Sequence, residues 1–256
     1  MLKKLVKNTY ISAIILFLYF PLFLLVYLSF NDAQYSNQWH QFSLQWFKEL
    51  FNDKQLIDSL VNSLILAFFS SLIATFNSVI ATTLLVLQRS HKLLQKFLLI
   101  PSFLIILPDL ILGVGFLIIL NVLNIPFGFI SLLIAHITFC MPFIIFSIIA
   151  KIKLFNRNYY LASLDLGASK FYTWRKVIMP ILSPAIISAF FLGFTLSFDD
   201  VIISYFVAGP EFNILPLTIF GMIRNGATPE LNALCTMTLL FSLILIIIAQ
   251  YKLRKS

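Results

Sequence analysis

Charge and glycine are both scarce in this chain. Only 11% of its 256 residues are Asp, Glu, Lys or Arg, and only 8 are glycine, whereas soluble domains carry roughly 25% charged residues. No GxxxxGK[ST] phosphate loop occurs, and the few glycines form no dinucleotide-binding fingerprint. The chain therefore lacks the usual means of hydrolysing ATP. Energy for any driven process would come from an ion gradient or from another subunit.

Cysteine and histidine are also rare. Cys140 and Cys235 both lie inside apolar runs, so they fit neither a disulfide framework nor a metal site. The three histidines, His40, His91 and His136, are far apart and lack metal-binding spacing. We expect no metal site. We interpret His136 as an interhelical hydrogen-bonding partner, with a proton relay as the alternative.

Long apolar runs dominate the rest. The sequence is 60% hydrophobic, with a mean hydropathy of +0.97. A membrane span needs about 20 predominantly apolar residues, and six segments qualify: residues 10–30, 59–87, 97–120, 127–150, 184–207 and 231–250. We predict an all-α membrane protein with six transmembrane helices, and residues 1–256 forming a single membrane domain.

The basic residues are distributed unevenly between the connecting loops. Fifteen of the eighteen Lys and Arg residues fall in the termini and alternate loops, and only Lys48, Lys54 and Arg224 fall on the opposite side. Such asymmetry is the positive-inside signal, so we expect both termini in the cytoplasm. The basic residues behind the net charge of +8 then set the orientation of the chain in the membrane, and we expect no nucleic-acid partner.

The external connections have their own patterns. In FSLQWFKELF, residues 42–51, the apolar side chains of Leu44, Phe47 and Phe51 share a helical face, which predicts a short interfacial helix; a solvated loop is the alternative. Residues 209–230 are rich in Gly and Pro, which favours an irregular or re-entrant segment.

A polar segment, residues 151–180, interrupts the apolar sequence and carries six Lys and Arg residues. Asn158 is expected to cap a helix over residues 159–166, and Gly167 to end it in a left-handed conformation. Ser169 is expected to cap a second helix that reaches about Ile178, and Pro180 to stop it. A solvated loop is the plain interpretation. We favour a docking surface, because the segment is rich in exposed aromatic and aliphatic residues: Tyr159, Tyr160, Leu161, Leu164 and Trp174.

Three carboxylates lie within predicted spans: Asp109, Asp199 and Asp200. Acids in membrane spans are costly and mark pathways by default. Asp109 is placed near the middle of the third span, directly after Pro108. On a continuous fifth helix Asp200 shares a face with the hydroxyls of Ser197 and Ser204, and Asp199 points about 100° away.

We therefore expect Asp200 to line a pathway and Asp199 to bond a neighbouring helix, with purely structural roles as the alternative for each. Carboxylates beside Phe and Tyr suit an organic cation, which aromatic faces also attract.

The polar segment resembles a loop of bacterial ABC importer permeases. That loop reads Glu-Ala-Ala, three residues, Gly, nine residues, then Ile-x-Leu-Pro. Here Leu161-Ala162-Ser163, Gly167 and Val177-Ile178-Met179-Pro180 have the same spacing. Leu161 stands where the pattern has Glu, and Ser163 where it has the second Ala. The resemblance implies the type I ABC importer permease fold, with residues 159–166 as the coupling helix.

The resemblance extends to the PotC-like spermidine/putrescine family. It rests on FSLQWFKELF, Asn62-Ser63-Leu64, LPDLILGVGFL, SFDDVIISYFVAGP and ILPLTIFGMIRNGATPELNAL. It implies a non-catalytic permease in the bacterial inner membrane that forms half of a polyamine pathway. The implied partners are a second related permease, two copies of a cytoplasmic ATPase that uses ATP and Mg, and a periplasmic polyamine-binding protein.

On this basis two sets of site residues are expected. Those for coupling to the ATPase are Tyr159, Leu161, Ala162, Asp165, Gly167, Ala168 and Pro180. Those for the pathway are Asp109, Ser197, Asp199, Asp200 and Ser204. The alternatives are an ABC permease for another cationic or small solute, a gradient-driven secondary transporter in which Asp109 or Asp200 carries a proton, and a scaffold without a pathway.

Overall fold

The computed structural model describes residues 2–33, 39–87, 91–156, 158–224, 229–240 and 243. Throughout these residues the regular elements are helices, apart from one isolated bridge between Asn31 and Phe42. The chain divides into two compact units. One consists of residues 59–217, and the other of residues 1–58 together with 218–256.

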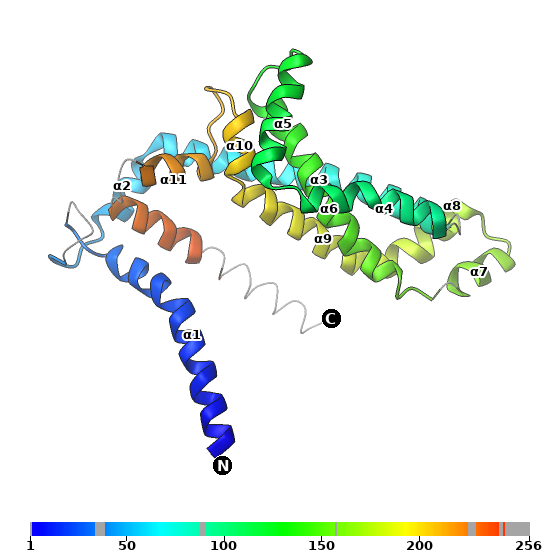
Figure 1. Ribbon diagram of the computed structural model, residues 1–256, viewed down its shortest axis with the longest axis horizontal. Helices are drawn as coiled ribbons and strands as arrows, with labels where there is room; N and C mark the ends of the chain where they lie inside the picture. Colours follow the sequence, from blue (N-terminus) through cyan, green and yellow to red (C-terminus); the bar gives the residue numbers. More distant parts are fainter. Residues whose placement is uncertain are drawn as a thin grey trace. The chain divides into compact units, whose positions relative to one another are not determined.

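The helices follow one another along the chain (Figure 1). They are α1 (Leu2–Leu28), α2 (Gln45–Asn52), α3 (Lys54–Leu87), α4 (His91–Ile106), α5 (Asp109–Val122), α6 (Phe129–Ile152), α7 (Asn158–Asp165), α8 (Lys170–Thr173), the π-helix η1 (Trp174–Ile178), α9 (Met179–Asp199), α10 (Ile202–Val207) and α11 (Leu215–Arg224). Residues 229–240 are also helical.

Four of the described helices are long and apolar enough to cross a membrane: residues 7–28, 54–83, 129–152 and 170–199. The pair α4 and α5 passes the same test together, bent by 105° between its halves. These helices match five of the six predicted spans. The sixth, at 231–250, lies largely outside the described residues.

The third predicted span is not one straight helix, which corrects the expectation for residues 97–120. α4 ends at Ile106 and α5 begins at Asp109, and the chain turns at Leu107 and Pro108. Pro108 cannot donate a backbone hydrogen bond, and its ψ of 137° is extended. Asp109 therefore lies in the first turn of α5, directly after the bend, where the positive end of the helix dipole favours a carboxylate.

The fifth span also differs from the expectation. Pro180 does not stop the helix, because α8, η1 and α9 run on without a break from Lys170 to Asp199. The π-turn at Trp174–Ile178 directly precedes Pro180, and there the N–H of Met179 bonds the Trp174 carbonyl. The break comes later, at Asp200, whose ψ of 124° is extended. α10 then begins at Ile202.

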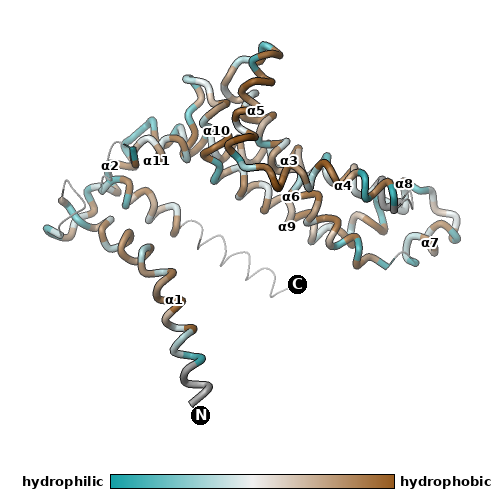
Figure 2. Tube along the Cα trace, in the orientation of Figure 1, coloured by the Kyte–Doolittle hydropathy of each residue, from teal (hydrophilic) through white to brown (hydrophobic). Residues whose placement is uncertain are grey.

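In the unit of residues 59–217, α6 forms the centre. Two clusters of buried apolar side chains share it. One joins α6 to α3, α9 and Tyr160, and the other joins its first turns to α5 and α10. Figure 2 shows apolar residues along α5, α6 and α9 and more polar ones toward α7. An apolar helix with buried residues along most of its length is what a span surrounded by other spans requires.

The half-helices α5 and α10 pack closely against each other beside α6 (Figure 1). The contact is at Gly113, where an added Cβ would lie 2.6 Å from Cδ2 of Phe206. Small residues let membrane helices approach in this way. The loops that follow both half-helices also meet, because a Cβ on Gly209 would lie 2.2 Å from the Phe127 carbonyl oxygen.

The other unit contains α1 and α2. The predicted short helix is confirmed as α2, in which the side chain of Leu50 is buried. Trp46 Nε1 donates to the Asn31 carbonyl at 2.8 Å, and Phe47 packs on Phe30. Burial raises the pKa of Glu230, and the nearby carboxylates of Asp53 and Glu49 raise it further. α11 shows that a short helix occupies part of the segment expected to be irregular.

Candidate functional site

The break between α9 and α10 is stabilised by the side chain of Asp200. Its Oδ1 accepts from the N–H of Ile203 at 3.3 Å, and its Oδ2 accepts from the N–H of Ser204 at 2.8 Å. The Ser204 hydroxyl also donates to Oδ2 at 2.8 Å. These bonds satisfy backbone donors that a new helix leaves without partners. Asp200 thus starts α10.

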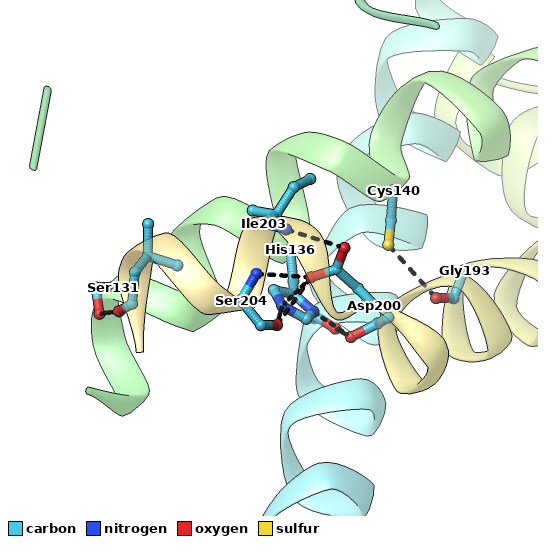
Figure 3. Close-up of polar contacts among 10 residues, drawn as sticks. Ser131, His136, Cys140, Gly193, Asp200, Ile203 and Ser204 are labelled. Carbon is cyan, nitrogen blue, oxygen red and sulfur yellow. Dashed lines mark hydrogen bonds and ion pairs between the residues drawn. The ribbon is translucent and has the colours of Figure 1, made fainter. Parts of the chain in front are cut away.

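His136 of α6 bridges the two sides of this break, as Figure 3 shows. Its Nδ1 lies 2.7 Å from the hydroxyl of Ser197 in α9, and its Nε2 lies 2.9 Å from the hydroxyl of Ser204 in α10. Nε2 is also 3.6 Å from Oδ2 of Asp200. The interpretation of His136 as an interhelical hydrogen-bonding partner is confirmed.

The hydrogen bonds fix the direction in which each proton is donated. The Ser204 hydroxyl gives its only proton to Asp200, so His136 Nε2 must donate to the Ser204 oxygen. His136 is then neutral when Nδ1 accepts from Ser197. The Ser197 oxygen in turn accepts from Ser70 of α3 at 2.9 Å. A single run of donors therefore links α3, α9, α6 and α10.

All five residues of this run, Ser70, Ser197, His136, Ser204 and Asp200, are at most 8% exposed. Buried polar groups in a membrane protein require partners, because no water replaces them there. Here the residues share a continuous set of hydrogen bonds between helices. We name this set the polar run.

The geometry of the polar run differs from the continuous helical face that was expected for Ser197, Asp200 and Ser204. Ser197, Asp200 and Ser204 do come together, but not along one continuous helical face, because α9 ends at Asp199. Asp200 points into the protein, whereas Asp199 is exposed. Within the described residues Asp199 makes no hydrogen bond or ion pair, so the expected bond to a neighbouring helix is not found there.

Asp109 is likewise exposed, in the first turn of α5. It makes no hydrogen bond to the polar run or to the rest of the described chain. The structure therefore divides the five expected pathway residues into two kinds. Three are buried in a shared network, and the two others, Asp109 and Asp199, are exposed carboxylates beside helix breaks.

The polar segment, residues 151–180, has the predicted helix, turn and helix. The φ of Gly167 is 85°, which is left-handed as expected. Its N–H bonds the Leu164 carbonyl at 2.9 Å, and the N–H of Ala168 bonds the Ser163 carbonyl at 3.1 Å. This pair of bonds is the Schellman motif. Ser169 caps α8 through the N–H of Tyr172, as predicted.

The start of α7 differs from the prediction. Asn158 is already the first helical residue, and Asn156 Oδ1 accepts from its N–H at 3.0 Å. The cap therefore lies two residues earlier than expected.

α7 is anchored to the membrane helices on one side only. Tyr160 is buried in the cluster around α6 and α9, which corrects its expected exposure. Ser163 and Thr173 share a 2.8 Å hydrogen bond between their hydroxyls, and Trp174 Nε1 donates to Thr83 of α3 at 3.2 Å. Exposed apolar side chains remain on α7 and on the segment that follows it: Tyr159, Leu161, Leu166, Phe171 and Tyr172. Ala162, Asp165 and Pro180 are exposed as well.

Among the described residues, no group of three or more His, Cys, Asp or Glu side chains could hold a metal ion. Cys140 and Cys235 are free thiols. Sequence reasoning missed the roles of Ser70 and of the Asp200 cap. Asp is one of the residues that commonly begin a helix. Two adjacent acids inside an apolar span could therefore have indicated that one helix ends and another begins there.

Two solved structures share this fold. The fold is similar to that of a bacterial ABC transporter involved in the import of the acidic polysaccharide alginate, with a TM-score of 0.74 at 14% identity over 98% of this chain and 96% of that one. It is also similar to the MetNI methionine ABC transporter in an inward-facing conformation, with a TM-score of 0.66 at 17% identity over 77% and 94% of the two chains. The fold is therefore shared with chains of two ABC transporters.

The chain belongs to the family of binding-protein-dependent transport system inner membrane components, whose model matches residues 92–254. It is 37% identical over 98% of its length to the spermidine/putrescine transport system permease protein PotC of Escherichia coli K12, covering 94% of that protein. PotC of Haemophilus influenzae is equally similar, with 97% of it covered. The putrescine permease PotI of Escherichia coli K12 is 31% identical over 87% of this chain and 82% of its own.

Proposed function

We propose that this chain is a permease subunit of an ATP-driven importer of polyamines. Full-length similarity to permeases named for spermidine and putrescine supports this substrate class. The geometry adds an exposed carboxylate, Asp199, at a break in a membrane helix. A site for an organic cation is the function that this arrangement supports best.

The carboxylate of Asp199 is the observation that carries the proposal. It ends α9, where the helix dipole is negative and disfavours a further negative charge. An exposed acid in that position gains from a cationic partner, which no described residue supplies. Phe198 stacks on Phe194 with 6.1 Å between ring centroids and 7° between planes, next to this acid. Aromatic faces add cation–π attraction for an ammonium group.

Asp200 is less suited to this task than the sequence indicated. It is buried, and both of its oxygens accept hydrogen bonds from α10. A substrate would have to displace those donors. We therefore assign the cation contact to Asp199, with Asp109 as a second exposed acid on the same subunit, and a structural role to Asp200.

Coupling to ATP hydrolysis is proposed for α7. Exposed apolar side chains on α7 and just after it, Tyr159, Leu161 and Leu166, suit docking against a protein. Its buried side connects through Tyr160 and the Ser163–Thr173 bond to the helix that ends at Asp199. A displacement of α7 would thus reach the cation site along one continuous helix.

The proposed complex contains this chain, a second related permease, two copies of a cytoplasmic ATPase that uses ATP and Mg, and a periplasmic polyamine-binding protein. In it the chain forms half of the pathway with six transmembrane helices. Both of its termini lie in the cytoplasm of a bacterial cell. The asymmetry of basic residues supports this orientation.

Replacing Asp199 by asparagine tests the cation site. Asp199→Asn keeps the volume and removes the charge, so uptake of labelled putrescine and spermidine should fall about tenfold or more, since bonds to charged groups are worth ~1.5–3 kcal/mol. The measurement is initial uptake in liposomes that contain the whole complex. Asp58→Asn, at another exposed acid, is the matched control and should transport normally.

Two results would contradict the proposal. Wild-type uptake by Asp199→Asn would remove Asp199 from the pathway. Uptake that persists without ATP and collapses with an ionophore would replace the ABC importer by a gradient-driven transporter.

A further inference from the structure

The break between α9 and α10 lacks the residues that usually interrupt a membrane helix. No Gly or Pro occurs between Ser197 and Ser204, so the backbone has no intrinsic need to break there. What holds the break open is a set of side-chain hydrogen bonds. Asp200 supplies those to the start of α10, and His136 is the side chain that bonds a residue on each side.

The position of His136 makes it a brace between three helices. It belongs to α6, it is fully buried, and its two ring nitrogens face opposite ways, one toward α9 and one toward α10 (Figure 3). Five residues earlier in α6, the Ser131 hydroxyl bonds the Val207 carbonyl at 2.7 Å. α10 is thus tied to α6 near its first turn and at its end.

We propose that His136 is a positioning residue for transport: as a neutral imidazole it fixes the gap between α9 and α10 and so holds Asp199 in place. Asp199 is the last residue of α9, two residues beyond the Ser197 hydroxyl that His136 holds. If the brace is lost, the bonds of Asp200 and of Ser131 still hold α10, but the side chain that bonds both α9 and α10 is gone. The expected effect on uptake rests on the proposed transport function. The claim that His136 fixes the junction between α9 and α10 does not depend on that function.

The direction of the hydrogen bonds in the polar run specifies which donor and acceptor a replacement for His136 must provide. Nδ1 accepts and Nε2 donates, and neither role needs a charge or a titrating proton. A glutamine amide offers one acceptor and one donor at a similar separation. His136→Gln should therefore retain the brace, whereas His136→Leu, which keeps the bulk and loses both bonds, should not.

The test uses a buried thiol as a reporter of the break. In a complex in which Cys140 and Cys235 are replaced by serine, Ile203→Cys introduces a thiol just beyond the break at a fully buried position. Its rate of reaction with N-ethylmaleimide in the purified complex should be low, and low again with His136→Gln. With His136→Leu it should rise about five- to thirty-fold, the change expected from losing one or two buried hydrogen bonds.

A second thiol excludes general unfolding. Leu132→Cys lies in α6 at an equally buried position in the same apolar cluster as Ile203. It should stay unreactive in every variant. If His136→Leu does not assemble, Ser197→Ala removes the bond of His136 to α9 and leaves the bonds of Asp200 to α10 intact, and it should raise the reactivity at Ile203→Cys. Ser204→Ala removes the bond of His136 to α10 together with one bond of Asp200, and it should raise the reactivity as well.

Uptake measurements complete the test. His136→Leu should lower the maximal rate by a similar factor and leave the half-saturating polyamine concentration unchanged, because fewer subunits hold Asp199 correctly. His136→Gln should transport like the wild type. Unchanged thiol reactivity in the leucine and serine variants would overturn the brace, and loss of transport in His136→Gln would show that a titrating imidazole is needed instead. Absence of polyamine uptake in the wild type would refute the proposed function alone, since the thiol measurement needs no substrate.

Discussion

Among single residues, Gly167 has the most demanding backbone. Its φ of 85° lies in the left-handed region, and nothing stands within 4 Å of an added Cβ. A substitution there is therefore strained by the backbone and not by crowding. A non-glycine residue in this region costs roughly 1–2 kcal/mol, and a β-branched one more.

The first prediction concerns this turn. Gly167→Val should fray the end of α7 and loosen the orientation of its exposed side, so that the purified complex loses ATPase subunits or hydrolyses ATP without transport. Subunit stoichiometry and polyamine-dependent ATPase activity would measure this. Gly167→Asn is the matched control, because asparagine tolerates the left-handed region, and it should behave nearly as wild type. Full stoichiometry and coupled uptake in the valine variant would mean that α7 is a plain connection.

Individual residues also show what the sequence could predict. Gly167 and Ser169 have local signals, a left-handed glycine and a helix cap, and both predictions hold. For His136 the sequence predicted an interhelical hydrogen bond but not its partners, since Ser197 and Ser204 lie 61 and 68 residues away in sequence. Pro180 misled the prediction because a π-turn accommodates it inside a helix.

At the scale of elements, apolar length and composition located the helices well, but the breaks depended on less local causes. The bend at Pro108 was not predicted, although the proline is a residue signal for it; the two halves meet at 105°. The break at Asp200 arises from a side chain that caps a new helix. A helical-wheel argument across such a break assigns the wrong faces, which is why Asp199 and Asp200 exchanged their expected environments.

The packing of α5 on α10 gives a second prediction. Gly113→Ala places a methyl group where Phe206 lies, at 2.6 Å, so the two half-helices must separate or the ring must move. The variant should lose about 1–3 kcal/mol of stability, the usual range for overpacking, seen as a lower thermal midpoint of the purified complex. Gly115→Ala, two residues on, meets nothing within 4 Å and is the control.

A double variant shows whether the contact itself is responsible. Phe206→Leu should recover most of the stability that Gly113→Ala loses, because neighbouring changes at one contact are not additive. If Gly113→Ala and Gly115→Ala are equally stable, the close approach of α5 and α10 is not what the structure indicates.

For the whole molecule, the testable property is its orientation in the membrane. The prediction of cytoplasmic termini places Asn37 and Asn213 outside and Ser169 inside. Asn37 lies outside the described residues, and Asn213 and Ser169 are both exposed. In a chain without Cys140 and Cys235, a thiol from Asn213→Cys should react with an impermeant maleimide in intact cells, provided the outer membrane has been made permeable.

The matched thiol is Ser169→Cys, which should react only after the inner membrane is opened. The two sites differ in the side of the membrane and not in their exposure. Labelling of Ser169→Cys in closed cells would invert the topology, and with it the proposed docking of α7 to a cytoplasmic ATPase.

The π-turn at Trp174–Ile178 has a consequence for chain length. A turn closed between Trp174 and Met179 winds one residue more than an α-helical turn does. The chain thus has a spare residue where the loop helix α8 passes into the membrane helix α9. Removing the exposed Arg175 would convert this turn to an ordinary one and keep the faces on either side in phase.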